Sequence, residues 1–215
     1  MKITIWSDFM CPFCYIGEAH LDKALVDFEH ADKVEIEYKS FLLSPEAAHD
    51  PDKNYYETFA DMKGMPIEEV NGMFGNVINM AKDAGLVIDY DKAKFSSTIP
   101  AHHAFQYAKE QGKGNEFFEK FYSAHFTDGE LLSDPETIIR LSEEIGLDGE
   151  AVRQSTIEQT YAEIINTDIQ EAGQVGVKGV PFYVFNNKYA VSGAQPVAQF
   201  KQVLDQVWQE ENEKL

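Results

Sequence analysis

Cysteine is scarce in this chain: only two of its 215 residues are cysteines, Cys11 and Cys14. A disulfide between them would close a very short loop and would add little stability by restricting the unfolded chain. A zinc site would need two further ligands, and the sequence has no second Cys-X-X-Cys or His-X3-His pair to supply them. The spacing therefore favours a third interpretation, a dithiol that takes part in thiol–disulfide exchange.

Basic residues and long apolar runs are also scarce. The chain has 18 lysines and arginines against 37 aspartates and glutamates, and its net charge of -19 argues against nucleic acid or an anionic membrane as a partner. No run approaches the ~18 apolar residues that a membrane span needs. No apolar leader precedes Cys11, so we expect a cytoplasmic protein. In such a reducing compartment a lone cysteine pair is typically catalytic.

The residues around the cysteines predict the start of a helix. Pro12 suits the first helical position, because the N–H group that it lacks would have no intrahelical partner there. Cys11 then becomes the N-cap, where the N–H groups of Phe13 and Cys14 and the positive end of the helix dipole favour an ionised sulfur. We therefore expect Cys11 to be the attacking thiol.

Cys14 begins an apolar stripe at helical spacing, which continues through Gly17, Leu21, Leu25 and Phe28. The stripe predicts that Cys14 lies inward and is more shielded than Cys11. We expect Cys14 to be the resolving thiol, which releases a substrate from its mixed disulfide with Cys11.

Apolar periodicity along the chain predicts an α/β fold. A β-α-β unit opens the chain, with a strand near residues 3–6, a helix over 12–29 and a strand over 34–39. Helices without a convincing strand follow over 44–153. A helix over 156–172, a β-hairpin and a final helix close the chain. The predicted inward stripe of the helix over 156–172 comprises Ile157, Tyr161, Ile164, Ile165 and Ile169.

This order of elements accompanies several short motifs. They are Ser7-Asp8, Cys11-Pro12-Phe13-Cys14-Tyr15-Ile16-Gly17, Ala101-His102, Gly179-Val180-Pro181-Phe182 and Val191-Ser192-Gly193-Ala194-Gln195. With them, essentially the whole chain resembles the DsbA-like thioredoxin superfamily and, within it, the FrnE-type branch of dithiol-disulfide isomerases. The resemblance implies a thioredoxin-like domain of residues 1–43 and 154–215 and a large all-helical insertion domain of residues 44–153.

The resemblance also implies a substrate-binding edge beside the cysteines. The Val180–Pro181 bond would be cis and lie against the cysteine pair, so that Pro181 blocks metal capture and the Val180 backbone pairs with an extended substrate. Pro12 and Phe13 would add apolar contacts. No metal and no cofactor are expected beyond the dithiol, although glutathione or another thiol could serve as co-substrate. The partner would be a disulfide- or thiol-containing protein or small molecule.

Each of three polar residues in or beside these motifs allows two interpretations. Asp8 could relay a proton to Cys14, or it could be a turn or cap residue at a strand end. His102 and His103 are adjacent, so on a helix they point about 100° apart and cannot both serve one site. One of them could line the face of the insertion towards the active site, or both could have packing or surface roles.

Three functions fit the sequence. The first is a thiol–disulfide oxidoreductase or isomerase. The second is a glutathione-dependent isomerase or transferase similar to 2-hydroxychromene-2-carboxylate isomerases and kappa-type glutathione transferases, which usually carry Ser for the first cysteine and lack the second thiol. The third is a redox-inert binding module. The intact pair favours the first function. Because neither Pro12 nor Phe13 can donate a side-chain hydrogen bond to a thiolate, we expect a potential more reducing than that of strong periplasmic oxidants.

Overall fold

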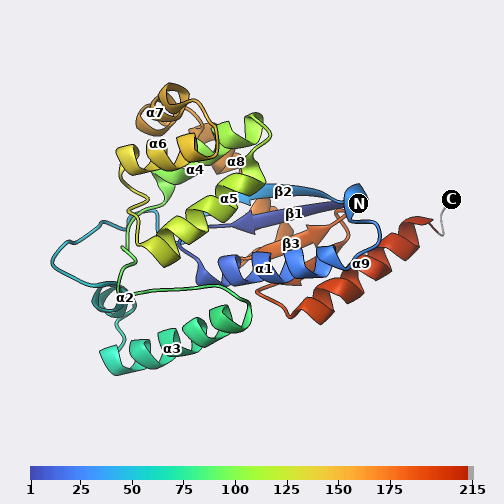
Figure 1. Cartoon of the computed structure of the whole chain (residues 1–215), viewed down its shortest axis with the longest axis horizontal. Coiled ribbons are helices and arrows are strands. Elements are labelled where there is room, and N and C mark those ends of the chain that lie inside the picture. Colours follow the sequence, from blue (N-terminus) through green and yellow to red (C-terminus); the bar gives the residue numbers. More distant parts are fainter. Residues whose placement is uncertain (213–215) are drawn as a thin grey trace.

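A mixed four-stranded sheet in the order β2-β1-β3-β4 forms the centre of the computed structural model, which describes residues 1–212 (Figure 1). The strands are β1 (Lys2–Ser7), β2 (Glu35–Ser40), β3 (Phe182–Phe185) and β4 (Tyr189–Ser192). Ile5 of β1 lies in register with Tyr38 of the parallel strand β2 and with Tyr183 of the antiparallel strand β3. Segments from both ends of the chain therefore build one sheet.

Helices cover both faces of the sheet. Because side chains alternate along a strand, Ile3 and Ile5 of β1 enter the core with α1 (Pro12–Val26), whereas Trp6 packs with Ala172 of α8 (Ala162–Val175) on the other face. Helix α9 (Val197–Asn212) lies beside α1 (Figure 1). The helix that carries the cysteines is thus held between the sheet and the rest of the core.

The packing of α1 is close at Gly17. A Cβ atom at this position would lie 3.2 Å from Pro181 Cγ and would also overlap the hydroxyl of Tyr183. Only a residue without a side chain allows this approach. The absence of that side chain brings the first turns of α1 against the Val180–Pro181 junction that precedes β3.

The middle of the chain is helical. In the described residues no strand lies between β2 and α8, and a short 3₁₀ helix (Ala31–Lys33) precedes β2. Figure 1 shows α4 to α7 grouped on one side of the α1 N-terminus, with α2 and α3 on the other. The helices of this part are α2 (Tyr55–Lys63), α3 (Ile67–Asp83), α4 (Ile99–Glu110), α5 (Gly114–Ser123), the π-helical turn Ala124–Asp128, α6 (Pro135–Glu144) and α7 (Gly149–Ile157). The predicted order of strands and helices is confirmed.

Two predicted helices are wrong in their limits. Helix α1 ends at Val26, three residues before the predicted end. The predicted helix over 156–172 covers the last two residues of α7, which was not predicted, then a turn at Gln159, whose φ is 53°, and most of α8. The new direction leaves Ile157 57% and Ile164 44% exposed, so the predicted inward stripe is wrong at these positions. Residue 153 falls within α7, and the limits of the insertion domain at 44 and 153 stay a prediction.

Candidate active site

Cys11 lies at the start of α1, as the sequence predicts. It is the N-cap residue, Pro12 occupies the first turn, and the backbone carbonyl of Cys11 accepts from the N–H of Cys14 at 3.0 Å. The sulfur does not accept a capping hydrogen bond from the helix. Instead its thiol donates to the carbonyl oxygen of Val180 at 3.4 Å. Both cysteines are free thiols, so this geometry belongs to the reduced protein.

Cys14 lies one turn further along α1 and is buried. Burial raises the pKa of its thiol well above the ordinary value, and a hydrogen bond with Cys11 and the charge of that sulfur raise it further. Hydrogen bonds with the Ser7 side chain and the Asp8 backbone act in the opposite direction. The Cys14 sulfur therefore keeps its proton in the reduced protein, where that proton can be shared with Cys11.

The buried sulfur has a polar neighbour in Ser7, and a second, partly buried polar pair lies one helical turn further along α1. The hydroxyl of Ser7 is hydrogen-bonded to that of Tyr122 on α5. Glu18, one helical turn after Cys14, accepts from the hydroxyl of Tyr38 at 2.7 Å, and burial raises the pKa of its carboxyl group to about 8. The raised pKa favours the protonated form of Glu18, whose side chain is half-buried. The sequence analysis did not single out Ser7, Tyr122 or Glu18 for a role at the site.

The Val180–Pro181 junction faces the cysteines from the end of β3. The peptide bond between these residues is cis, which agrees with what the resemblance implies. Pro181 is buried against the Gly17 turn of α1, and the Val180 carbonyl is the acceptor for Cys11. Two segments far apart in the sequence thus meet at one sulfur.

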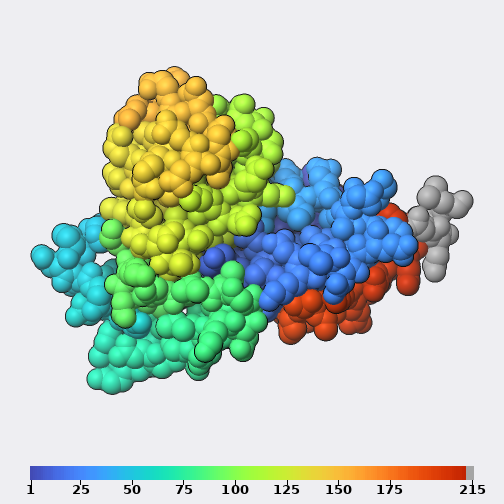
Figure 2. Space-filling view, in the orientation of Figure 1, coloured from blue at the N-terminus to red at the C-terminus, as the bar shows by residue number. Residues whose placement is uncertain are grey.

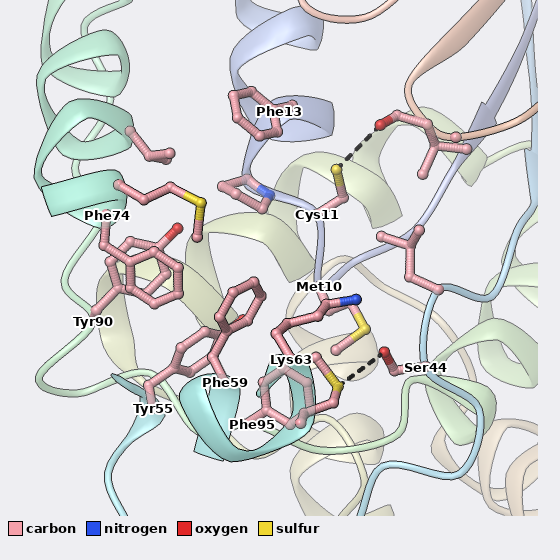
Figure 3. Close-up of a pocket in the computed structure, with 17 residues that line it drawn as sticks. Met10, Cys11, Phe13, Ser44, Tyr55, Phe59, Lys63, Phe74, Tyr90 and Phe95 are labelled. Carbon is pink, nitrogen blue, oxygen red and sulfur yellow. Dashed lines mark hydrogen bonds between the residues drawn. The ribbon is translucent and has the colours of Figure 1, made fainter. Parts of the chain in front are cut away.

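A pocket of about 320 Å³ opens beside Cys11. Pro12 and Phe13 line its near wall together with Cys11 and Val180, and Phe13 leaves 39% of its surface exposed (Figure 3). The structure therefore brings all the predicted substrate-binding residues except Pro181 to the wall of a single pocket.

The far wall of the pocket was not predicted. It is built by α2, α3 and the segment that follows α3, and its larger side chains are Tyr55, Phe59, Met62, Met73, Phe74, Tyr90 and Phe95. In Figure 3 these aromatic rings lie across the pocket from Cys11 and Phe13. Tyr55, Phe59 and Met62 recur at helical spacing, which marks one face of a helix, but the sequence does not say that this face meets Cys11.

Known proteins share both this fold and this chain's sequence pattern. The profile of the DSBA-like thioredoxin domain matches residues 2–205. The chain belongs to the DSBA-like thioredoxin domain family. A crystal structure of a probable DsbA oxidoreductase from Streptomyces coelicolor is 36% identical to it, with a TM-score of 0.91 over 98% of this chain and 91% of that chain.

Two further proteins are similar to this DSBA-like chain. The uncharacterized protein YwbO of Bacillus subtilis (strain 168) is 25% identical over 223 residues, which cover 100% of this chain and 98% of that protein. A structure of 2-hydroxychromene-2-carboxylate isomerase shares the fold at a TM-score of 0.71 and 14% identity, and it covers 100% of both chains.

Asp8 of this DSBA-like chain has a structural role at the active-site loop. Its buried carboxylate accepts from the Thr98 hydroxyl and the Leu43 N–H, both at 2.7 Å, and from the Met10 N–H at 3.4 Å. These bonds fix the loop before Cys11 to segments that precede α2 and α4. The described residues show no hydrogen bond from this carboxylate to either sulfur, so the geometry favours the turn interpretation over the proton relay.

His102 continues a buried chain of hydrogen bonds behind that loop. The side-chain amide of Gln106 donates to Ser40 Oγ and to Asp168 Oδ2, at 2.9 Å each. Because the Asp8 carboxylate can only accept, His102 Nε2 donates to Asp8 Oδ1 at 3.4 Å, and His102 Nδ1 is hydrogen-bonded to Ser40 Oγ at 3.0 Å. This chain runs between α4, α8, the end of β2 and the loop before Cys11.

His103 points elsewhere, as the helical geometry predicts. Its Nδ1 accepts from the Tyr161 N–H at 3.2 Å, at the start of α8. Burial, and to a smaller degree the neighbouring His102, lower the pKa of His103 to about 4, so it is a neutral acceptor there. Neither histidine lines the pocket.

The described part of the chain offers no cluster of three or more His, Cys, Asp or Glu side chains placed to hold a metal ion. Among the helices of residues 1–212, none combines the length and the apolar character that crossing a bilayer requires.

The candidate site holds a dithiol whose two sulfurs lie in different surroundings. One sulfur opens to a pocket and touches Val180, and the other is buried and keeps its proton.

Proposed function

We propose that this protein is a thiol–disulfide oxidoreductase or isomerase in which Cys11 attacks and Cys14 resolves. One observation carries the proposal: Cys11 lines the pocket at the N-terminus of α1, while Cys14 is buried one turn behind it with a raised pKa. Exchange needs one sulfur that a substrate can approach and a second sulfur within reach of the first. Cys11 leaves only 4% of its surface exposed, so we propose that a substrate reaches it through the pocket that it lines.

The reaction proceeds in two displacements. The Cys11 thiolate attacks a sulfur of the substrate disulfide, a mixed disulfide forms, and the other substrate sulfur leaves as a thiolate. Cys14 then loses its proton and attacks the Cys11 sulfur, which releases the second substrate thiolate. Two electrons pass from the dithiol to the substrate, and the protein is left with a Cys11–Cys14 disulfide. The reverse sequence oxidises a substrate dithiol.

Val180, Pro181, Pro12 and Phe13 are proposed to bind the substrate. The Val180 carbonyl already accepts from the Cys11 thiol, so it lies where the backbone of an extended substrate would pair during attack. Pro181 has no N–H group to donate, and Pro12 and Phe13 present apolar surface on the pocket side. A disulfide- or thiol-containing protein or small molecule fits this edge.

The reaction as proposed uses no metal and no cofactor beyond the dithiol itself, and glutathione or another thiol could recycle it. We further propose a cytoplasmic location, because the cytosolic disulfide reductase DsbM of Pseudomonas aeruginosa shares the fold, and we propose the FrnE-type branch on the motifs given above. Neither assignment changes the chemistry at Cys11.

The pocket also gives some support to a second candidate, a glutathione-dependent isomerase or transferase acting on an organic electrophile. Its volume is that of a small-molecule site, and 2-hydroxychromene-2-carboxylate isomerase shares the fold. The second thiol has no part in such a reaction, because glutathione would supply the nucleophile. The presence of Cys14 therefore favours exchange.

Insulin reduction and reactivation of scrambled ribonuclease test the proposal. The wild-type protein should turn over in these assays, and Cys11→Ser should not. Cys14→Ala should stop turnover but accumulate a covalent adduct at Cys11. Wild-type activity in either assay that persists in Cys11→Ser would contradict the proposal and favour a redox-inert module. Glutathione-dependent conversion of an electrophile that is indifferent to Cys14→Ala would favour the isomerase or transferase.

A further inference from the structure

The pocket beside Cys11 has a composition that restricts its substrate. We propose that the physiological substrate is a low-molecular-weight disulfide or thiol whose sulfur carries an apolar aromatic group of one or two rings, and that this group enters the pocket while the sulfur meets Cys11. This inference rests on the proposed function and adds the class of substrate to it.

The size of the pocket sets the first limit. Its volume is about 320 Å³. An apolar cavity of about 150 Å³ holds one benzene molecule, and pockets for small ligands begin at about 300 Å³. The space therefore suits a group of one or two fused rings, with a short link that reaches Cys11 at the pocket wall. It is a concave site for a small group rather than a flat surface for a folded protein.

The side chains on the pocket wall set the second limit. Aromatic rings such as Tyr55, Phe74 and Tyr90 offer faces and edges to a ring in the pocket. Met10, Met62 and Met73 also line it, and their flexible thioether side chains adapt to guests of different shape. Burial raises the pKa of both tyrosines, so their hydroxyls remain neutral at physiological pH.

Charge on the pocket wall sets the third limit. Among the described residues that line the pocket, Lys63 alone carries a charged side chain, and it is exposed at the rim. Glutathione carries two carboxylates and an ammonium group, and burying them here would leave most of that charge unpaired. The pocket therefore favours an uncharged aromatic group over the glutathionyl group.

The chemical step follows the exchange described above. The Cys11 thiolate attacks the sulfur that bears the aromatic group, and the other substrate sulfur leaves as a thiolate that takes a proton from water. Cys14 then gives up its proton to water, and its thiolate displaces from Cys11 the thiolate that bears the aromatic group, which takes up a proton from water. One substrate disulfide becomes two thiols, and the protein dithiol becomes a disulfide.

Stopped-flow oxidation of the reduced protein tests this specificity. The two probes are 2-(2-naphthyl)ethyl 2-hydroxyethyl disulfide and bis(2-hydroxyethyl) disulfide, whose sulfurs are all alkyl-bound. Each rate is divided by the rate of the same probe with dithiothreitol, which removes intrinsic reactivity. The wild-type protein should prefer the naphthyl probe by about tenfold or more, which corresponds to roughly 1.4 kcal/mol. Oxidised glutathione should react no faster than bis(2-hydroxyethyl) disulfide.

A matched pair of variants on α3 tests whether the preference for the naphthyl probe arises in the pocket. Met73 lines the pocket, whereas Met80 lies two turns further along the same helix, is 40% exposed and is not part of the wall. Met73→Trp should fill the pocket and reduce the preference to about one, because the rate for the naphthyl probe falls more than the rate for bis(2-hydroxyethyl) disulfide, and Met80→Trp should keep the wild-type preference.

If Met73→Trp does not fold, a measurement on the wild-type protein alone still tests the inference. 2-(2-Naphthyl)ethanol, which has no sulfur, should slow alkylation of Cys11 by iodoacetamide in the wild-type protein, and 2-methoxyethanol should not. Equal normalised rates for the two probes, or no protection by the naphthyl alcohol, would overturn the inference while exchange at Cys11 stands. Reaction with neither probe would overturn the proposed function as well.

Discussion

The thiol of Cys11 donates a hydrogen bond to the carbonyl oxygen of Val180, and its sulfur does not cap its own helix. The reactive sulfur is therefore placed by two elements together, the first turn of α1 and the junction before β3. Gly17 permits this contact, because it lets α1 approach Pro181 and Tyr183.

The two thiols should differ in reactivity. Iodoacetamide at neutral pH should label Cys11 at least about tenfold faster than Cys14, because Cys11 lines the pocket whereas burial keeps the Cys14 thiol protonated. Mass spectrometry of peptides from a time course measures both rates. Each single variant, Cys11→Ser and Cys14→Ala, gives the rate of the other thiol alone. Preferential labelling of Cys14 would reverse the assigned roles.

A side chain at Gly17 should destabilise the protein. In Gly17→Ala the new methyl group would meet Pro181 and the buried Tyr183, and such overpacking typically costs about 1–3 kcal/mol. Gly75→Ala is the matched control, because Gly75 also lies inside a helix but has no atom within 4 Å of the added Cβ, and its replacement should add about 0.5–1 kcal/mol of stability. Urea unfolding measures both changes. If the two variants shifted the midpoint in the same direction, the close approach of α1 would be in doubt.

Removing His102 should loosen the loop before Cys11. His102→Leu leaves the Ser40 hydroxyl and the Asp8 carboxylate each short of one partner, and an unmet buried group costs about 1–3 kcal/mol. The free energy of unfolding should fall by that amount, and Cys11 should be alkylated at a changed rate. His49→Leu, in the loop between β2 and α2, serves as the control. A loss of stability no greater than in that control would mean that the hydrogen-bond chain contributes little.

His125 should contribute a loss of stability in mild acid. This side chain is buried in the π-helical turn, neither ring nitrogen has a partner among the described residues, and burial lowers its pKa from 6.5 to about 4. A depressed histidine pKa means that the unfolded chain binds the proton first, so stability is complete above about pH 6.5 and declines as the pH falls towards 4. Between pH 7 and pH 5 the loss from this group should be about 2 kcal/mol.

His125→Phe separates this group from the others. His103, whose pKa is also lowered to about 4, contributes to the same acid loss and remains in the variant. Glu18, whose pKa is raised to about 8 by burial, acts in the opposite direction, because the folded protein binds this proton at a higher pH than the unfolded chain does. The change in stability from pH 7 to pH 5, measured by urea unfolding at each pH, should therefore be more favourable in His125→Phe than in the wild-type protein by about 2 kcal/mol. The same change in both proteins would show that His125 does not titrate in this range.

The reduction potential should lie below that of the strongest oxidants. Neither Pro12 nor Phe13 offers a side-chain donor to the Cys11 sulfur, so the reduced state lacks the stabilisation that such a donor gives. Equilibration in glutathione buffers measures the potential. Phe13→His should raise it, whereas Phe13→Leu should leave it within error. A wild-type potential of about -120 mV, the value of the strongest oxidants, would contradict the prediction.

The sequence was most informative where local chemistry decides the structure. The Cys-Pro sequence specifies the start of α1 by itself, because proline fits only the first turn of a helix. The Val180–Pro181 junction and its place beside the cysteines came from the resemblance. Neither required knowledge of how distant helices pack.

The sequence was least informative where tertiary packing decides. The break at Gln159 was missed because apolar residues continue at helical spacing across it, while α7 turns to pack against α4 and α6. Asp168 is buried on the inner face of α8, a position that apolar periodicity assigns to a hydrophobic residue, because Gln106 and Ser40 satisfy its carboxylate. The far wall of the pocket was missed for the same reason, since it depends on where α2 and α3 lie.

The central position of β1 has a consequence during synthesis of the chain. Val180 lies 169 residues after Cys11, and at about 5–20 residues per second the ribosome needs roughly 8–34 s to deliver it. During that interval the nascent chain exposes a cysteine pair whose covering strand does not yet exist. Oxidants or other nascent thiols can reach the pair then, so the dithiol can react before the protein has finished folding.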